Sequence, residues 1–413
     1  MVVPADQIAQ VRTNQEAEQL FGLFELAFGP GDANLWRTFH CRQPFCRREW
    51  CRIIKRDGQI VSHVCWVPRD IRIGRAVIHA GAIGYTATHP DYRGQGLAGR
   101  LMRSWTQDLT ESGYHISFLT AIPKFYEHFG YEFAFPSDDR DPPVVIDVIN
   151  LPDEPTNRTV RQYGDDDLAA LMSLYDVENA QRTGSLVRTP EYWDWLLNGL
   201  EASGRLHRDE IWLAEDSKQH IVGYAFLRHR LEGRYEVLEA AASDDATADD
   251  LLGLAAVNAR AVDAMAVELK LPLDHRVVRR VLMRGASLTA PSYGLHARIL
   301  NLHSLFVALQ PELQRRLRRS EQREWRGTLG LRTDIGELDI GITNGEVVVD
   351  TQISPLHIVE IPQWLLVKLV TGYTNVGGVA GAGRTNIDPD LHPPLRALFP
   401  KGCPYMWNVD VGY

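Results

Sequence analysis

The sequence has no long hydrophobic run. No stretch approaches the roughly 20 apolar residues that a membrane-spanning helix needs. The first 20 residues also lack the basic segment followed by an apolar core that marks a secretory signal. We therefore expect a cytoplasmic protein without a membrane span.

Cysteine is scarce, with five residues in a chain of 413. A small odd number is typical of reduced thiols rather than of a disulfide framework. Cys41, Cys46 and Cys51 are evenly spaced and His40 stands beside them. Because a zinc site usually presents two closely spaced ligand pairs, free thiols are the favoured interpretation and no metal is expected.

An excess of positive charge is also absent. Lys and Arg number 44 against 53 Asp and Glu, which gives a net charge of −9. This balance argues against a general nucleic-acid binder and is compatible with an amine substrate. The hydrophobic content of 45% is that of a globular protein, and 413 residues exceed one ordinary core, so we expect two or three domains.

The sequence does contain a glycine-rich turn between an apolar strand and a helix. Pro90 and Asp91 end the strand. The turn consists of Arg93, Gly94, Gln95, Gly96, Leu97 and Ala98. Glycine lets the backbone approach a ligand closely, and the free N–H groups and dipole of a helix N-terminus attract phosphate oxygens. The turn is therefore predicted to bind a pyrophosphate.

Two other phosphate loops are alternatives. A Walker loop requires Gly-x-x-x-x-Gly-Lys-Ser/Thr, which the turn does not have. The Rossmann pattern Gly-x-Gly-x-x-Gly is present literally in residues 94–99, but that pattern alone is weak evidence. The more specific features are Arg-x-x-Gly-x-Ala shortly after a strand-ending proline, and an aromatic block, FYEHFGYEF, at residues 125–133.

These two features resemble the acetyl-CoA signature of the GNAT N-acetyltransferases. The resemblance implies that the strand before the turn is splayed from its neighbour and that Thr86 and Thr88 bond the pantetheine arm of acetyl-CoA. It also implies that two helices near the N-terminus form a wall of the acceptor site. Glu25 and Trp36 are then candidate substrate contacts, the alternatives being a solvated carboxylate and a core indole.

Beyond the first 150 residues the order of helices and strands repeats coarsely, but no glycine loop follows the third strand of the repeat. Residues 141–157 are rich in Pro and Asp and are interpreted as a linker. A new unit begins near Ala297 and contains a hairpin at Asn344-Gly345. The arginine run at residues 315–319 is interpreted as a solvated helical face rather than an RNA or membrane contact.

This organisation resembles the Eis (enhanced intracellular survival) type of GNAT acetyltransferase. The implied fold class is α+β, with tandem GNAT domains and a sterol-carrier-protein-like domain. The expected boundaries are residues 1–150 for the catalytic domain, 151–290 for a second domain without a cofactor loop, and 291–413 for a third domain with a docked C-terminus. A homo-oligomer, possibly a hexamer, is also implied.

The resemblance assigns catalytic roles to two tyrosines. Tyr126 would protonate the departing CoA thiolate, and the terminal carboxylate of Tyr413 would act as base. A phenol with an ordinary pKa near 10 is protonated at pH 7, whereas a free terminal carboxylate is a weak base unless it is desolvated. Family members often end in Phe after an acidic residue, but this chain ends Val411-Gly412-Tyr413. The alternative for Tyr126 is a core aromatic residue.

The function expected from the sequence is acetyl-CoA-dependent N-acetyl transfer. The acetyl group would pass directly to a primary amine, because no cysteine lies in the signature block to act as a covalent nucleophile. The acceptor would be an aminoglycoside-like or polyamine-like small molecule, or a protein lysine. The alternative from another class is a non-catalytic acyl-CoA or lipid-binding carrier or regulator.

Overall fold

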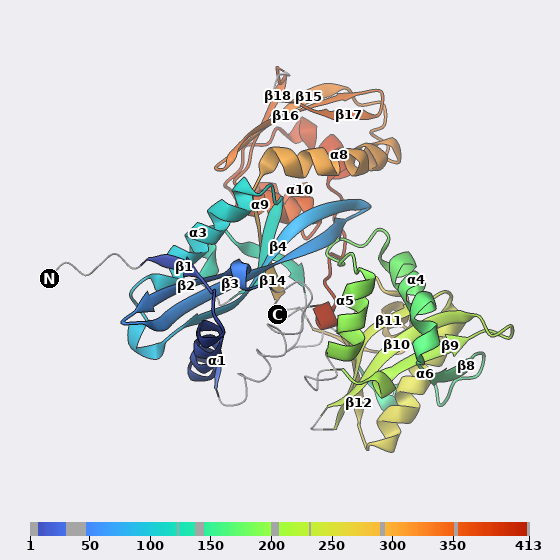
Figure 1. Ribbon diagram of the computed structural model, residues 1–413. Helices are drawn as coiled ribbons and strands as arrows, with labels where there is room; N and C mark the ends of the chain where they lie inside the picture. The colour runs from blue at the N-terminus through green and yellow to red at the C-terminus, as the bar shows by residue number, and fades with distance from the viewer. Residues whose placement is uncertain are drawn as a thin grey trace.

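The described part of the chain contains three β-sheets (Figure 1). The structure is a computed structural model, and it describes residues 7–29, 47–121, 124–136, 144–199, 206–230, 233–289, 294–350 and 354–410. Two of the predicted site residues, Trp36 and Tyr413, lie outside these ranges. Among the described residues, no helix combines the length and apolar character that a bilayer crossing requires.

The first sheet has the strand order β1-β2-β3-β4-β5-β14-β6. Its strands are β1 (Ile8–Gln10), β2 (Cys51–Arg56), β3 (Gln59–Ile73), β4 (Ala76–Thr88), β5 (Ile116–Thr120), β6 (Glu132–Pro136) and β14 (Gly294–Ile299). Helices α1 (Asn14–Phe28) and α3 (Leu97–Glu111) pack into separate hydrophobic clusters, which take alternate strand residues such as Ile53 and Ile54. The helices therefore cover opposite faces of the sheet, and burial on both faces accounts for the apolar strands.

Local sequence explains where α1 begins. Thr13 accepts a hydrogen bond from the backbone N–H of Glu16, and the Glu16 carboxylate accepts one from the backbone N–H of Thr13. This capping box satisfies two otherwise unpaired donors at the helix start. The helix ends at Gly29, whose φ of 128° disfavours any residue with a side chain.

The second sheet has the order β13-β7-β12-β11-β10-β9-β8. Its strands are β7 (Val144–Asp147), β8 (Thr159–Gln162), β9 (Ile211–Glu215), β10 (Ile221–Arg230), β11 (Arg234–Ala242), β12 (Ala266–Leu269) and β13 (Ser287–Leu288). The helices of this unit are α4 (Leu168–Asn179), α5 (Pro190–Asp194), α6 (Asp245–Ala261) and α7 (Arg276–Leu282).

The third sheet has the order β17-β16-β15-β18. Its strands are β15 (Gly327–Thr333), β16 (Gly336–Thr343), β17 (Glu346–Val349) and β18 (His357–Glu360). Its helices are α8 (Leu302–Arg318), α9 (Gln363–Val370), α10 (Val376–Gly381) and α11 (His392–Leu398). Asn344 and Gly345 have φ values of 51° and 74°, which confirms the tight hairpin predicted between β16 and β17.

Two strands lie in sheets that the sequence does not predict. β7 pairs with β12 in the second sheet, so the linker interpretation of residues 141–157 is wrong for residues 144–147. β14 lies between β5 and β6 in the first sheet, although it follows the whole second unit in the chain. The apolar pattern of a strand shows that it is buried but not which strand it pairs with, so sequence boundaries at 150 and 290 do not separate the sheets.

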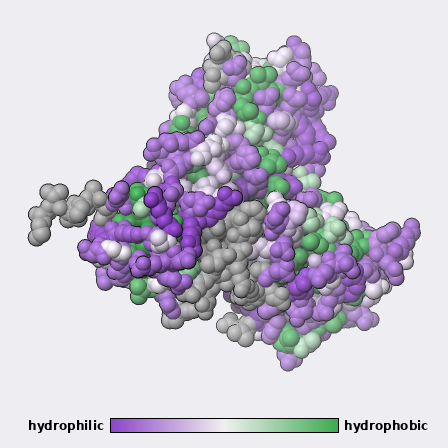
Figure 2. Space-filling view, viewed as in Figure 1, coloured by the Kyte–Doolittle hydropathy of each residue, from purple (hydrophilic) through white to green (hydrophobic). Residues whose placement is uncertain are grey.

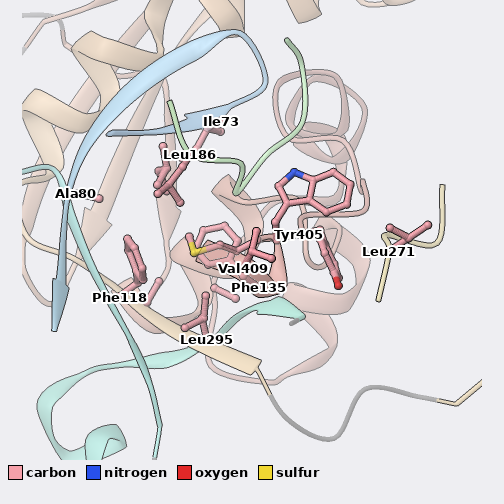
Figure 3. Close-up of a cluster of buried hydrophobic side chains, with 14 of the residues drawn as sticks. Ile73, Ala80, Phe118, Phe135, Leu186, Leu271, Leu295, Tyr405 and Val409 are labelled. Atoms are coloured by element: carbon pink, nitrogen blue, oxygen red, sulfur yellow. The ribbon is translucent and has the colours of Figure 1, made fainter. Parts of the chain in front are cut away.

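The segment that precedes the C-terminus packs between the units. The backbone N–H of Tyr405 donates to the Thr183 carbonyl at 2.8 Å, and Trp407 Nε1 donates to Asn179 Oδ1 at 2.8 Å. Figure 3 shows Tyr405 and Val409 in one buried cluster with Phe135 of the first unit. Tyr405, Met406, Trp407 and Val409 of this segment are buried. Hydrophilic residues cover much of the face of the molecule seen in Figure 2.

Candidate acyl-donor site

A pocket with a volume of about 530 Å³ lies beside the end of β4 in the first unit. Its lining residues are Ala27, Phe28, Thr86, Ala87, Thr88, Tyr92, Arg93, Gly94, Gln95, Gly96, Leu97, Ala98, Gly99, Phe125 and Tyr126. The structure thus brings together all eight residues predicted to contact the cofactor and the tyrosine predicted to act as acid.

One wall of the pocket is the last part of β4, where the sheet opens. β4 pairs with β5 only from Ala80 to Ile83. Beyond Ile83, Gly84, Ala87 and Thr88 pair with β3, and residues 85–86 lie at a register shift. A register shift opposite His63 accompanies a φ of 55° at Tyr85, whose carbonyl lies 2.7 Å from His63 Nδ1. Such a bulge bends the strand locally. Residues 84–88 therefore extend beyond the part of β4 that β5 covers.

The second wall is the glycine turn and the first turn of α3. Gly94 and Gly96 have φ values of 75° and 73°, and a Cβ built on either would meet no atom within 4 Å, so the surface of the turn is open. The first N–H groups of α3 have no partner within the helix. Both features suit a pyrophosphate, since the helix N-terminus favours negative charge.

Two arginines lie beside the turn. Arg93 Nε donates to the Thr88 carbonyl at 3.4 Å, which links the turn to the end of β4. Arg56 of β2 donates to Gln95 Oε1 at 2.5 Å and lies 5.3 Å from the Tyr92 ring centroid. Arg56 was not among the predicted site residues, because 39 residues separate it from Gln95 and only the sheet brings them together.

Only one of the two tyrosines in the aromatic block lines the pocket. Tyr126 is buried, and its ring meets Phe125 edge-on at 4.8 Å. Tyr131 is buried, does not line the pocket, and donates a hydrogen bond to Ser117 Oγ at 2.8 Å. Burial raises the pKa of Tyr131 to about 12, so it stays protonated. Of the two tyrosines in the aromatic block, Tyr126 is therefore the one at the pocket wall, and Tyr92 of the turn before α3 lines the pocket as well.

Residues distant in the sequence form hydrogen bonds with the turn that carries Tyr126. Arg298 of β14 donates to the Phe129 carbonyl at 2.6 Å, and the Gln363 amide of α9 donates to the Gly130 carbonyl. Gln363 Oε1 also accepts from the backbone N–H of Ile299 at 3.1 Å. No local pattern predicts these supports, because 169 and 233 residues separate the partners.

The remaining candidates lie elsewhere. Glu25 is exposed on α1 and does not line the pocket, although Ala27 and Phe28 of the same helix do. Cys51 and Cys65 are buried thiols, and the Cys51 Sγ donates to the Cys65 Sγ at 3.4 Å. Within the described part of the chain, no group of three His, Cys, Asp or Glu side chains is placed to hold a metal ion.

Comparison with known families identifies the first unit. Residues 10–134 match the family model described as "Acetyltransferase (GNAT) domain". The uncharacterized N-acetyltransferase YhbS of Escherichia coli K12 is 33% identical over 84 residues, which cover 20% of this chain and 49% of that protein. The chain therefore spans about half the length of the curated relatives it matches.

Solved structures share the overall fold over nearly the whole chain. A GCN5-related N-acetyltransferase from Anabaena variabilis has a TM-score of 0.78 at 17% identity, covering 99% of this chain and 100% of its own. Its counterpart from Kribbella flavida has a TM-score of 0.74 at 18% identity, with coverages of 98% and 99%. Eis1 from Mycobacterium abscessus has a TM-score of 0.69 at 15% identity, with coverages of 97% and 99%.

Proposed function

Given that residues 10–134 are a GNAT acetyltransferase domain and that the chain has an Eis-like fold, we propose that the protein is an N-acetyltransferase. It takes the acetyl group from acetyl-CoA and transfers it directly to a primary amine. The observation that carries the proposal is the pocket that joins the end of β4 beyond its pairing with β5, the glycine turn and Tyr126.

Each wall of the pocket has a part in the proposed reaction. The glycine turn and the N-terminus of α3 hold the pyrophosphate, and the backbone of Thr86 and Thr88 orients the pantetheine arm. The amine nitrogen attacks the thioester carbonyl and gives up a proton to the base, the C–S bond breaks, and Tyr126 donates its phenolic proton to the departing thiolate. General acid catalysis of this kind typically contributes about 10²–10⁴-fold in rate.

Several finer assignments belong to the proposal. The base is the terminal carboxylate of Tyr413, which follows the buried Asp410 by three residues. The acceptor is an aminoglycoside-like or polyamine-like molecule or a protein lysine, and Glu25 and Trp36 are its candidate contacts. The third unit is sterol-carrier-like, which its four-stranded sheet packed against α8 supports. The protein is a cytoplasmic homo-oligomer, possibly a hexamer.

The alternative, a carrier that binds acyl-CoA or lipid without turnover, has less support. A carrier needs no proton donor at the thioester, yet Tyr126 lines the same pocket as the cofactor turn. Lipid that copurifies with the full chain, together with no acetylation of any amine, would favour the carrier.

The test is CoA release from acetyl-CoA with a panel of amines, aminoglycosides and lysine peptides. We expect Tyr126→Phe to lower kcat by about 10²–10⁴-fold while acetyl-CoA still binds. Tyr131→Phe is the matched control, because it removes the same hydroxyl from a tyrosine that does not line the pocket; it should retain turnover. Removal of Gly412 and Tyr413 tests the terminal base. If acetyl-CoA binds but no amine is acetylated by the intact protein, the proposed reaction is wrong.

A further inference from the structure

A second pocket lies where the three units meet. Its volume is about 320 Å³, and it shares no lining residue with the acyl-donor pocket. The lining residues are Gly74, Glu178, Gln181, Arg182, Thr183, Asp274, Glu312, Arg315, Arg316, Thr371, Gly372, Pro400, Lys401, Gly402, Cys403 and Pro404. We call it the junction pocket.

The wall from the second unit is anionic. Arg182 NH2 lies 2.9 Å from Glu178 Oε1, and Arg182 NH1 lies 2.7 Å from Asp274 Oδ1. The single guanidinium of Arg182 therefore pairs with two carboxylates, which leaves a formal excess of one negative charge. The Arg182 side chain is only 9% exposed, and its buried Nε has no hydrogen-bond partner among the described residues.

The wall from the third unit is cationic. Arg315 and Arg316 share the buried carboxylate of Glu312, each at 2.7 Å, and Lys401 makes no ion pair within the described part of the chain. Three cations thus face one anion, a formal excess of two positive charges. Burial lowers the pKa of Arg316. The carboxylate of Glu312, which Arg316 shares with Arg315, therefore does not fully compensate the loss of hydration of the Arg316 guanidinium.

Close packing keeps this arrangement in place. Gly74, in the turn between β3 and β4, has a φ of 58°, and a Cβ built on it would lie 2.1 Å from Glu312 Oε1. Arg316 NH1 also donates to the Leu398 carbonyl at 3.0 Å. The cationic wall is therefore preorganised, so binding an anion there costs little side-chain entropy.

We propose that the junction pocket binds a small phosphate-bearing molecule, with its phosphate against Arg315, Arg316 and Lys401. Guanidinium groups match phosphate oxygens with paired N–H donors, and a lysine adds a mobile point charge. The pocket is larger than one phosphate ion, so the remainder of the ligand extends toward Glu178 and Asp274. That remainder carries hydrogen-bond donors such as hydroxyl or amino groups.

The test is calorimetric titration of the full chain with inorganic phosphate at constant ionic strength. An Arg93→Gln background weakens any phosphate binding at the glycine turn. In that background we expect one phosphate per chain, and at least 10-fold weaker binding after Arg315→Gln or Lys401→Gln. Arg319→Gln is the matched control, because it removes the same charge from an exposed residue at the end of α8 outside the pocket. Equal affinity in all four proteins would overturn the proposal.

Cys403 supplies an independent readout because it lines the junction pocket and is exposed. Its alkylation by iodoacetamide, followed by peptide mapping, should slow several-fold with phosphate and saturate at the concentration found by calorimetry. Lys401→Gln should abolish this protection, and since Lys401 is exposed, its loss should leave the fold intact. Alkylation that is insensitive to phosphate would contradict the proposal whether or not the protein transfers acetyl groups.

Discussion

At the scale of single residues, burial decides which ionisable groups remain neutral. His275 is completely buried beside β11. Its Nε2 lies 3.0 Å from the Ala240 carbonyl, and its Nδ1 accepts from the Val277 N–H at 3.2 Å. The ring is therefore a neutral tautomer with the proton on Nε2. Burial, assisted by the charge of Arg182, lowers its pKa to about 3.

This depressed pKa predicts a pH-dependent stability. The unfolded state gains a proton on His275 below its ordinary pKa of about 6.5, whereas the folded state does not until about pH 3. The contribution of neutral His275 to the free energy of unfolding is therefore present above pH 6.5 and is lost as pH falls toward 3. Between pH 7 and 5.5, about 1 kcal/mol of unfolding free energy should be lost through His275.

Denaturant unfolding at the two pH values measures this loss. His275→Gln should be less stable at pH 7 but should lose about 1 kcal/mol less than the parent on acidification. His220→Gln, on an exposed turn, is the control. The same pH dependence in His275→Gln and the parent would show that another group titrates.

At the scale of elements, two helix N-termini differ in what they leave for a ligand. The N-cap residue of α3 is Gly96, which has no side chain to cap the helix. The N-cap residue of α6 is Asp244, whose carboxylate accepts from the Thr247 N–H at 2.7 Å and pairs with Arg158 at 2.7 Å. The N-terminus of α6 is therefore occupied by a carboxylate of the protein, whereas that of α3 remains open to an anion.

A charge placed on the first turn of α3 tests this difference. Ala98→Glu should raise the KM for acetyl-CoA at least 10-fold, because the carboxylate repels the pyrophosphate. The fold should be unaffected, since an acidic residue in the first turn of a helix interacts favourably with the dipole. Gln107→Glu, an exposed change on the same helix, should leave KM unaltered. An unchanged KM in Ala98→Glu would mean that the cofactor does not approach this turn.

At the scale of the whole molecule, a buried charge cluster fixes the C-terminal segment to the second unit. Arg188 lies 2.5 Å from Glu239 and 2.9 Å from Asp410, and all three side chains are fully buried. Tyr192 and Tyr224 donate to the two carboxylates at 2.9 and 2.8 Å. Burial raises the pKa of Glu239, so the cluster depends on the single guanidinium.

Removal of Arg188 should be severe. Arg188→Met leaves two buried carboxylates without a cation and should cost about 3–5 kcal/mol of unfolding free energy. Limited proteolysis should then cut the C-terminal segment faster. Adding Glu239→Gln should recover part of the stability, because it removes one of the unpaired charges. Full stability in Arg188→Met would show that the cluster contributes nothing net.

The third unit also supports the proposed catalytic turn. Gln363→Ala removes the contacts to the Gly130 carbonyl and to the Ile299 N–H. If Tyr126 acts as the acid, this variant should lower kcat about 10-fold with little change in acetyl-CoA affinity, because small displacements of a catalytic group are costly. An unaltered kcat would show that the turn holds its geometry alone.

A matched glutamine in the same unit controls for a general loss of packing. The Gln310 side chain on α8 accepts from the backbone N–H of Val349 at 3.3 Å, so it supports the third sheet and not the catalytic turn. Gln310→Ala should therefore leave kcat unchanged. An equal fall in kcat in both variants would show that the effect comes from the stability of the third unit.

Local sequence determined the elements of the candidate site. The glycine turn at residues 93–98 and the helix after it depend on glycine conformation and apolar periodicity, which adjacent residues encode. The hairpin at Asn344-Gly345 was predictable for the same reason. In the glycine turn, the helix and the hairpin, interactions between residues close in the sequence are strong enough to determine the backbone conformation.

Tertiary structure alone decided what surrounds those elements. The sequence interpretation of residues 315–319 as a solvated face missed that Arg315 and Arg316 share Glu312 in a pocket between units. It was also not predictable that β7 pairs in the second sheet and β14 in the first. The same holds for the hydrogen bond from Gln363 to the Gly130 carbonyl. These contacts join residues far apart in the chain, and they depend on complementary shape and charge that no local pattern carries.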